Sequence, residues 1–138
     1  MRRTIFAFGL LVAMLVAVAA CGQPAASGPA LTGMTWQWTE QTIGEPATIP
    51  NPEAYTISFA TDGTFSAKVD CNQASGAFTT TAEGGITITP GPMTLAACPE
   101  GSLDSAYLAG LSGASGFSIT GDELTLTTAT GTMTFAPG

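Results

Sequence analysis

Hydrophobic and polar residues alternate along most of the chain after residue 34. Side chains two positions apart lie on the same face of a β-strand, so alternation predicts strands with one buried and one solvated face. The pattern is clearest where Tyr55, Ile57 and Phe59 are separated by threonine and serine. Eight such stretches are predicted as strands, at residues 34–39, 55–59, 65–69, 76–81, 86–88, 117–119, 124–126 and 133–135.

Turn signals separate these predicted strands. Asp62-Gly63 between two alternating stretches is a strong hairpin signal, and Ser75-Gly76 and Gly84-Gly85 are also interpreted as turns. Prolines interrupt the alternation in two places, which are interpreted as a loop at residues 42–52 and an irregular crossing at residues 90–99.

One helix is predicted over residues 102–112. Ser102 suits its N-cap and Asp104 its first turn, and Leu103, Tyr107 and Leu111 share one face at a spacing of four. Short strands at hairpin spacing avoid open edges by closing on one another. The expected fold is therefore mainly β with one helix, a small antiparallel barrel-like domain of about eight strands.

The first twenty residues form a separate element that is predicted to be an export signal. Arg2 and Arg3 precede an uncharged run at residues 5–20, which is shorter than the ~20 residues of a membrane span. The run ends in Val-Ala-Ala before Cys21 and resembles the bacterial lipobox, in which the cysteine receives a lipid and becomes the new N-terminus. The alternative is an ordinary secretory signal followed by an incidental cysteine.

This interpretation divides the chain into three parts. Residues 1–20 are the lipoprotein signal peptide, residues 21–33 a flexible Pro/Gly-rich tether with a lipidated Cys21, and residues 34–138 the β domain. The expected location is a bacterial membrane surface that faces the periplasm or the cell exterior. The lipid anchor itself would supply the membrane contact.

Charge narrows the classes of partner. Only 9% of residues are charged, against a usual ~25%. Because Arg2 and Arg3 fall in the signal peptide, the exported chain keeps one basic residue, Lys68, against ten acids, for a net charge of −9. A domain this acidic lacks the basic footprint of a nucleic-acid binder, and a monomer without nucleic acid is expected.

Few residues of the chain could act in catalysis or as metal ligands. The chain has no histidine, which removes a Ser-His triad and the commonest transition-metal ligand. Two cysteines without histidine fall short of a four-ligand metal site, and the acids are scattered. We therefore expect neither an enzyme nor a metal or cofactor site.

Two cysteines remain if Cys21 carries lipid. In an oxidising compartment Cys71 and Cys98 are expected to form a disulfide, with a reactive thiol as the alternative. Asn72 is a candidate ligand-binding residue, although an Asx-type turn is favoured. Trp36 and Trp38 share one strand face and are interpreted as core or rim residues, with a sugar-stacking platform as the alternative.

The order of these features resembles the META domain family, which includes the HslJ-like heat-shock proteins. The matching residues are the early Trp36 or Trp38, the 55–59 strand before Asp62-Gly63, and Asp70-Cys71-Asn72, where the family typically has Gly-Cys-Asn. The segment from Met93 to Cys98, the helix and the closing hairpin follow in the family's order. The resemblance implies a small barrel-like domain with one helix, often on exported lipoproteins, linked to stress response or antibiotic tolerance. It implies no catalytic residues.

Three functions remain as hypotheses. The first is a non-enzymatic accessory or binding role in the cell envelope, with an envelope protein as partner. The second is an inhibitor of an exported hydrolase, since an acidic domain suits a basic enzyme. The third is a barrel that carries a small apolar ligand.

Overall fold

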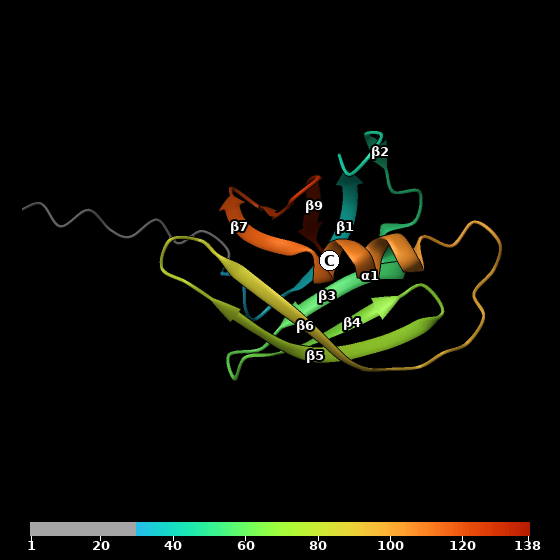
Figure 1. The fold of residues 1–138 in the computed structure, drawn as a ribbon, viewed down its shortest axis with the longest axis horizontal. Coiled ribbons are helices and arrows are strands. Elements are labelled where there is room, and N and C mark those ends of the chain that lie inside the picture. Colours follow the sequence, from blue (N-terminus) through green and yellow to red (C-terminus); the bar gives the residue numbers. More distant parts are fainter. Residues whose placement is uncertain (1–29) are drawn as a thin grey trace, which may run out of the picture.

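The structure is a computed structural model that describes residues 30–138. Over that range the chain forms one nine-stranded antiparallel sheet and one α-helix (Figure 1). The strand order is β6-β5-β4-β3-β1-β9-β8-β7, with the short β2 beside β1. The elements are β1 (Thr35–Gln41), β2 (Ala47–Thr48), the 3-10 turn η1 (Pro52–Ala54), β3 (Tyr55–Phe59), β4 (Thr64–Val69), β5 (Asn72–Thr80), β6 (Ile86–Met93), α1 (Asp104–Ser112), β7 (Ala114–Thr120), β8 (Glu123–Thr128) and β9 (Gly131–Pro137).

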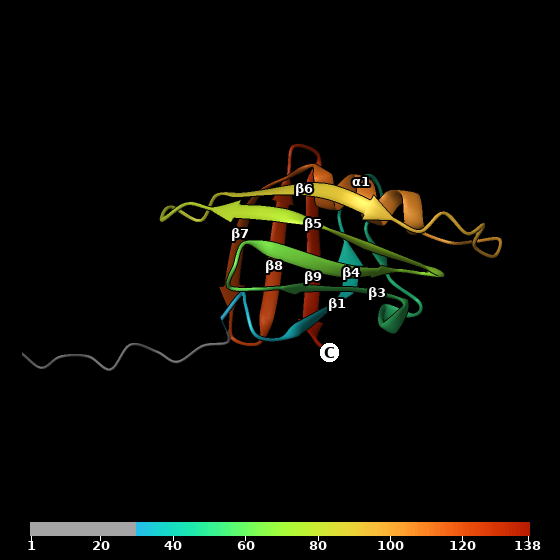
Figure 2. The same ribbon diagram turned by 90° about the horizontal axis from the view of Figure 1, so that it is seen from below.

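The sheet is curled into a half-barrel. A bulge between Trp38 and Glu40 bends β1 where it pairs with β9, and Figure 2 shows β7, β8 and β9 running across the direction of β3 to β6. The two outer strands meet at one end, where Gly85 bridges Gly116 and the amide of Phe117 donates to the Gly84 carbonyl at 2.8 Å. The expectation of a mainly β, barrel-like domain with one helix is confirmed.

The inner face of the curled sheet holds the hydrophobic core. Inward side chains alternate with outward polar ones, and the largest fully buried side chains include Trp36, Trp38 and Phe135. The helix covers the gap between the outer strands and adds Tyr107 and Leu111 to this core, as its spacing predicts. Burial on this scale is the main stabilising term of the fold.

Most observed strands are longer than predicted, and two boundaries differ in ways that change an interpretation. The helix begins at Asp104 rather than at Ser102, whose hydroxyl accepts the Asp104 amide at 3.2 Å. The strand predicted from residue 76 begins at Asn72, so the interpretation of Ser75-Gly76 as a turn is wrong. Gly76 lies inside β5, at a bulge in the β5–β6 pairing. Glycine is required there because the backbone of β6 approaches too closely for a side chain.

Replacing Gly76 with alanine is therefore expected to destabilise the fold. The added Cβ would collide with the Thr89 carbonyl and lie 2.7 Å from the Phe65 ring and 2.9 Å from the Gly91 amide nitrogen. Overpacking of this kind costs about 1–3 kcal/mol, measurable by urea unfolding. Ser75→Ala, at an exposed neighbouring position, is the matched control. Equal unfolding midpoints for the two variants would contradict this prediction.

The prolines do not produce the irregular crossing expected from residue 90. Strand β6 continues through Pro90 and Pro92 to Met93 and stays paired with β5. A strand at the edge of a sheet tolerates proline because the amides on its free side have no ladder partner. The bulge in the β5–β6 pairing lies between Pro90 and Met93, and bulges also accommodate proline. The sequence pattern does not predict this continuation, because proline within an alternating stretch is interpreted as the end of a strand.

The loop predicted at residues 42–52 contains the two-residue strand β2, which pairs with the end of β1. At the other end of β1, Leu31 packs against the core and its carbonyl accepts the Trp36 indole N–H at 3.0 Å. Thr32 forms a parallel bridge with Phe59. Although Leu31 and Thr32 belong to the stretch expected to be a tether, they are attached to the barrel.

Candidate functional site

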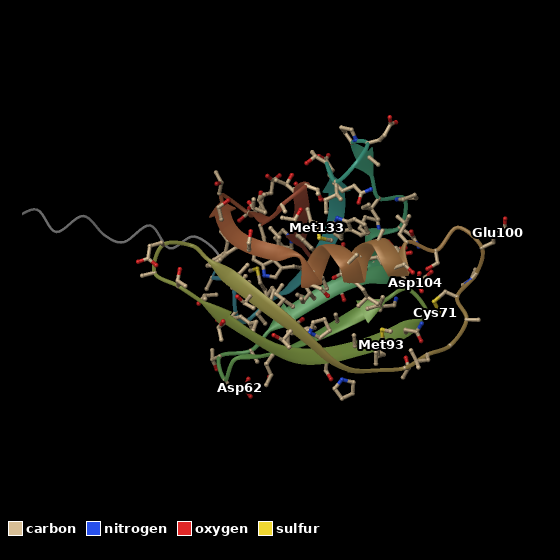
Figure 3. The ribbon with its side chains drawn as sticks, viewed as in Figure 1. Asp62, Cys71, Met93, Glu100, Asp104 and Met133 are labelled. Carbon is tan, nitrogen blue, oxygen red and sulfur yellow. A yellow bond between two sulfur atoms is a disulfide. The ribbon has the colours of Figure 1, made fainter. Side chains whose placement is uncertain are left out.

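The segment that leaves β6 and leads to α1 is irregular and is tied to the sheet by a disulfide. Residues 94–99, which we call the stapled loop, form neither helix nor strand. A disulfide joins Cys98 in this loop to Cys71 in the β4–β5 turn, with an S–S distance of 2.04 Å and a Cα–Cα distance of 5.5 Å. Figure 3 shows the loop projecting beyond the end of the helix, between Met93 and Glu100. The expected pairing of the two cysteines is present.

Asn72 holds the middle of the stapled loop. Its side chain is 4% exposed. Its Oδ1 accepts the Ala96 amide at 2.8 Å and the Thr94 hydroxyl at 3.0 Å, while its Nδ2 donates to the Ala96 carbonyl at 3.0 Å. The same Nδ2 lies 3.4 Å from the Cys98 sulfur. A single amide therefore binds both backbone groups of Ala96.

These contacts change the interpretation of Asn72. Its bonds reach more than twenty residues along the chain, whereas an Asx-type turn would use its own neighbours. Both acceptor sites of the amide oxygen are used, and the amide nitrogen serves the Ala96 carbonyl and the sulfurs. No bonding capacity is left for a ligand. The role that the structure assigns to Asn72 is to fix the loop.

Hydrogen bonds also fix both ends of the segment that connects β6 to α1. At the start, the Thr94 amide donates to the Gln73 carbonyl and the Gln73 amide donates to the Thr94 hydroxyl, both at 3.0 Å. At the far end, the Leu103 amide donates to the Tyr55 hydroxyl at 2.8 Å. That hydroxyl donates in turn to the Asp70 carboxylate at 3.4 Å, next to the disulfide.

Asp70 occupies a strained position in the turn that carries Cys71. Its φ is +57°, and it is the one non-glycine residue with positive φ among residues 30–138. This left-handed conformation favours glycine and tolerates aspartate. It explains why aspartate can stand here where the resemblance implies glycine.

Leu95 is the exposed residue on the loop that Asn72 and the disulfide hold in place. Its side chain is 84% exposed, and it is the one large hydrophobic side chain that is exposed within the described part of the chain. Both of its neighbours, Thr94 and Ala96, are bound to Asn72. No charged residue occurs between Glu83 and Glu100. The arrangement can therefore offer an apolar side chain in a fixed position to another molecule.

The two tryptophans lie elsewhere, inside the barrel. Trp36 and Trp38 are both 0% exposed, so neither ring is available for a sugar to stack on. Trp38 packs against Tyr55 and Tyr107, with ring centroids 5.7 and 5.2 Å apart. The Trp38 indole nitrogen and the Tyr107 hydroxyl have no hydrogen-bond partner among the described residues. Burial raises the pKa of Tyr107 well above its ordinary value, so its phenol stays neutral.

The described surface also carries several shallow depressions, among them one of about 280 Å³ between α1 and the β8–β9 turn, lined by Ile43, Ala106 and Ala109 among others. More open ones of about 470 and 420 Å³ lie between β1 and β3 and beside the end of β6. Over residues 30–138, no group of three or more acids and cysteines comes together to hold a metal ion. No helix in that range is long and apolar enough to cross a membrane. Cys21 and the predicted signal peptide lie outside the described residues.

Sequence reasoning found the disulfide and singled out Asn72 but missed Leu95 as a functional candidate. The signal was available in outline, because Leu95 stands in a long uncharged stretch beside a cysteine and between prolines. What the pattern could not show is that this leucine points outward while hydrophobic residues of the strands point inward. That distinction depends on the long-range bonds of Asn72.

Comparison with solved structures finds the same fold. A DUF4847 family protein from Bacteroides vulgatus aligns with a TM-score of 0.60 at 16% identity, covering 77% of this chain and 93% of that one. A protein from Burkholderia xenovorans aligns with a TM-score of 0.61 at 18% identity, covering 85% and 96%. A further NMR structure aligns with a TM-score of 0.56 at 27% identity, covering 75% and 87%.

No curated protein matches the chain. The META domain, in contrast, matches residues 29–137, which is nearly the whole range that the structure describes. The early tryptophan, the Cys71-Asn72 pair and the segment before Cys98, which carry the resemblance, all fall inside this match. The chain belongs to the META domain family.

Proposed function

We propose that this protein is exported, is anchored to a bacterial membrane by a lipid on Cys21, and binds another protein of the cell envelope without catalysing a reaction. The observation that carries the binding role is Leu95, 84% exposed on a loop that Asn72 and the disulfide hold in place. The anchor rests on the sequence before Cys21. The membership in the META family suggests stress or antibiotic tolerance as the setting.

A fixed apolar side chain favours protein binding for two reasons. Exposed apolar surface gains free energy when a partner covers it, at about 25 cal/mol per Å². A loop that is already ordered also loses less conformational entropy on binding than a flexible one. The contacts of Thr94 and Ala96 with Asn72 supply this order before any partner arrives.

The alternative of an apolar-ligand carrier is supported less well. The space enclosed by the half-barrel is occupied by large buried side chains, among them Trp36, Trp38 and Phe59. The depression beside α1 holds about 280 Å³, below the roughly 300–1,000 Å³ of ligand pockets, and those of about 420 and 470 Å³ lie open on the outer surface rather than inside the barrel. The surface loop is therefore the favoured site of binding.

The lipid anchor is tested by replacing Cys21 with alanine. Because the thiol is the acceptor of the lipid, cells that express Cys21→Ala and are fed an alkyne-tagged fatty acid should yield unlabelled protein, and the protein should leave the membrane fraction. Cys71→Ser is the matched cysteine control and should stay labelled. Labelling that persists in Cys21→Ala would refute the anchor.

The binding role is tested by placing a photo-crosslinking residue at position 95 or at position 61. Thr61 is exposed in the β3–β4 turn, at the end of β4 opposite Cys71. In intact cells, position 95 should give one discrete adduct that position 61 lacks. The protein in that adduct, once identified and purified, should bind the wild-type chain and bind Leu95→Asp roughly 10-fold or more weakly. Identical adducts at both positions would contradict the proposed binding site.

A further inference from the structure

The stapled loop has the features that an endopeptidase requires of a bound substrate. It is an irregular segment without turns, it exposes one large side chain, and residues 94–97 carry no charge. Such enzymes hold a short segment of chain and insert one side chain into a specificity pocket. Leu95 is the one large apolar side chain of the described residues that is exposed to such a pocket.

A substrate leaves the enzyme in two pieces after cleavage, whereas the two sides of this loop would stay joined by the disulfide and by the hydrogen bonds of Asn72. We propose that the stapled loop inhibits a serine endopeptidase with an apolar specificity pocket, with Leu95 filling that pocket and the Leu95–Ala96 peptide bond lying at the nucleophile. This proposal rests on the protein-binding role above and names the class of its partner. A pocket that accepts a leucine is the apolar slot of chymotrypsin-type and subtilisin-type enzymes.

Asn72 holds the leaving group of that reaction. In the forward step the enzyme's serine oxygen bonds to the Leu95 carbonyl carbon, the C–N bond breaks, and the serine proton passes through the enzyme's histidine to the Ala96 nitrogen. Asn72 accepts from that nitrogen at 2.8 Å and donates to the Ala96 carbonyl at 3.0 Å. The new amine therefore stays beside the ester.

A retained amine favours the reverse reaction. Attack of the Ala96 amine on the ester re-forms the peptide bond and returns the proton to the serine, with no further reactant. Water must take the amine's place for hydrolysis, and an amine held in position acts at a high effective concentration. The enzyme is then occupied by a ligand that it releases slowly, which is inhibition.

The disulfide joins the two sides of the scissile bond. Cys71 precedes Leu95 in the chain and Cys98 follows Ala96, so a cleaved molecule stays in one piece. Pairing of β1 with β9 also connects the two halves. The acidic surface adds a preference for enzymes with a basic face, because opposite charge raises the rate of association at low salt.

The test uses the full-length protein with three purified endopeptidases, namely chymotrypsin, subtilisin and trypsin. The wild-type chain should slow chymotrypsin or subtilisin and leave trypsin unaffected. Leu95→Asp should weaken that inhibition roughly 100-fold, and Leu95→Lys should transfer it to trypsin, whose pocket carries an aspartate. Thr61→Asp is the exposed control and should inhibit like the wild type. Since Leu95 is 84% exposed, none of these variants should alter the fold.

Mass spectrometry of the recovered inhibitor supplies a second readout. A nicked fraction should gain the mass of one water, remain one molecule without reductant, and separate between residues 95 and 96 after reduction. Absence of inhibition of both apolar-pocket enzymes, or rapid cleavage at this bond with no loss of enzyme activity, would overturn the proposal. If crosslinking at position 95 then identified a partner other than a peptidase, the proposed protein-binding role would stand and this inference alone would fail.

Discussion

Replacing both Cys71 and Cys98 with serine should lower the free energy of unfolding by about 3.5 kcal/mol. The bond links residues 27 positions apart, and closing a loop of that length in the unfolded chain removes entropy worth about that amount. Because total stability is only about 5–15 kcal/mol, this loss is a large fraction of the whole. Urea unfolding of the variant and the oxidised wild type measures it directly.

The control for this variant is the wild-type chain itself under reducing conditions. Reduction removes the same covalent link without changing the sequence, so the reduced protein and the double-serine variant should unfold at the same denaturant concentration. Loss of less than ~1 kcal/mol in the variant would contradict the account, because the β4–β5 turn and the stapled loop would then be held together without the bond.

The second large effect is expected from Asn72→Ala, at about 3 kcal/mol. The substitution removes three hydrogen bonds that the amide makes to Thr94 and Ala96, together with its contacts to the sulfurs. Each bond contributes about 0.5–1.5 kcal/mol, so three of them together account for about 3 kcal/mol. The measurement is again urea unfolding, with hydrogen exchange at the Ala96 amide as a local readout.

Gln73→Ala is the matched control for Asn72. Gln73 is the next residue of the same strand, its side chain is exposed, and its contacts with Thr94 are made by the backbone. Removing its side chain should change the unfolding free energy by less than ~0.5 kcal/mol. Similar effects for the two variants, or slow exchange of the Ala96 amide in Asn72→Ala, would show that the loop does not depend on the amide.

Much of the fold follows from the sequence because alternation and turn chemistry are local signals. Tyr55, Ile57 and Phe59 alternate with polar residues and are all buried, and Asp62-Gly63 forms the expected turn, with Gly63 at a φ of +83°. The face shared by Tyr107 and Leu111 is also buried. In each case neighbouring residues alone determine the outcome.

The predictions from sequence are wrong where contact with a distant segment of the chain determines the local structure. The local pattern around Gly76 indicates a turn, yet Gly76 lies in a strand. The residue there is glycine because the backbone of β6 leaves no room for a side chain. Pro90 and Pro92 indicate an interruption, yet an edge strand accommodates them. The site shows the same limit, because the role of Asn72 depends on Ala96, twenty-four residues away.

The measurement that tests the central claim most directly is the backbone order parameter of residues 95–97 from nitrogen-15 relaxation of the oxidised protein. If Asn72 and the disulfide fix the stapled loop, the amides of Leu95, Ala96 and Ala97 should give values near ~0.85, as rigid backbone does. Values below ~0.6 would mean that the loop is flexible on its own. Leu95 would then be a mobile side chain rather than a presented one, and both the binding role and the inhibitory loop would lose their basis.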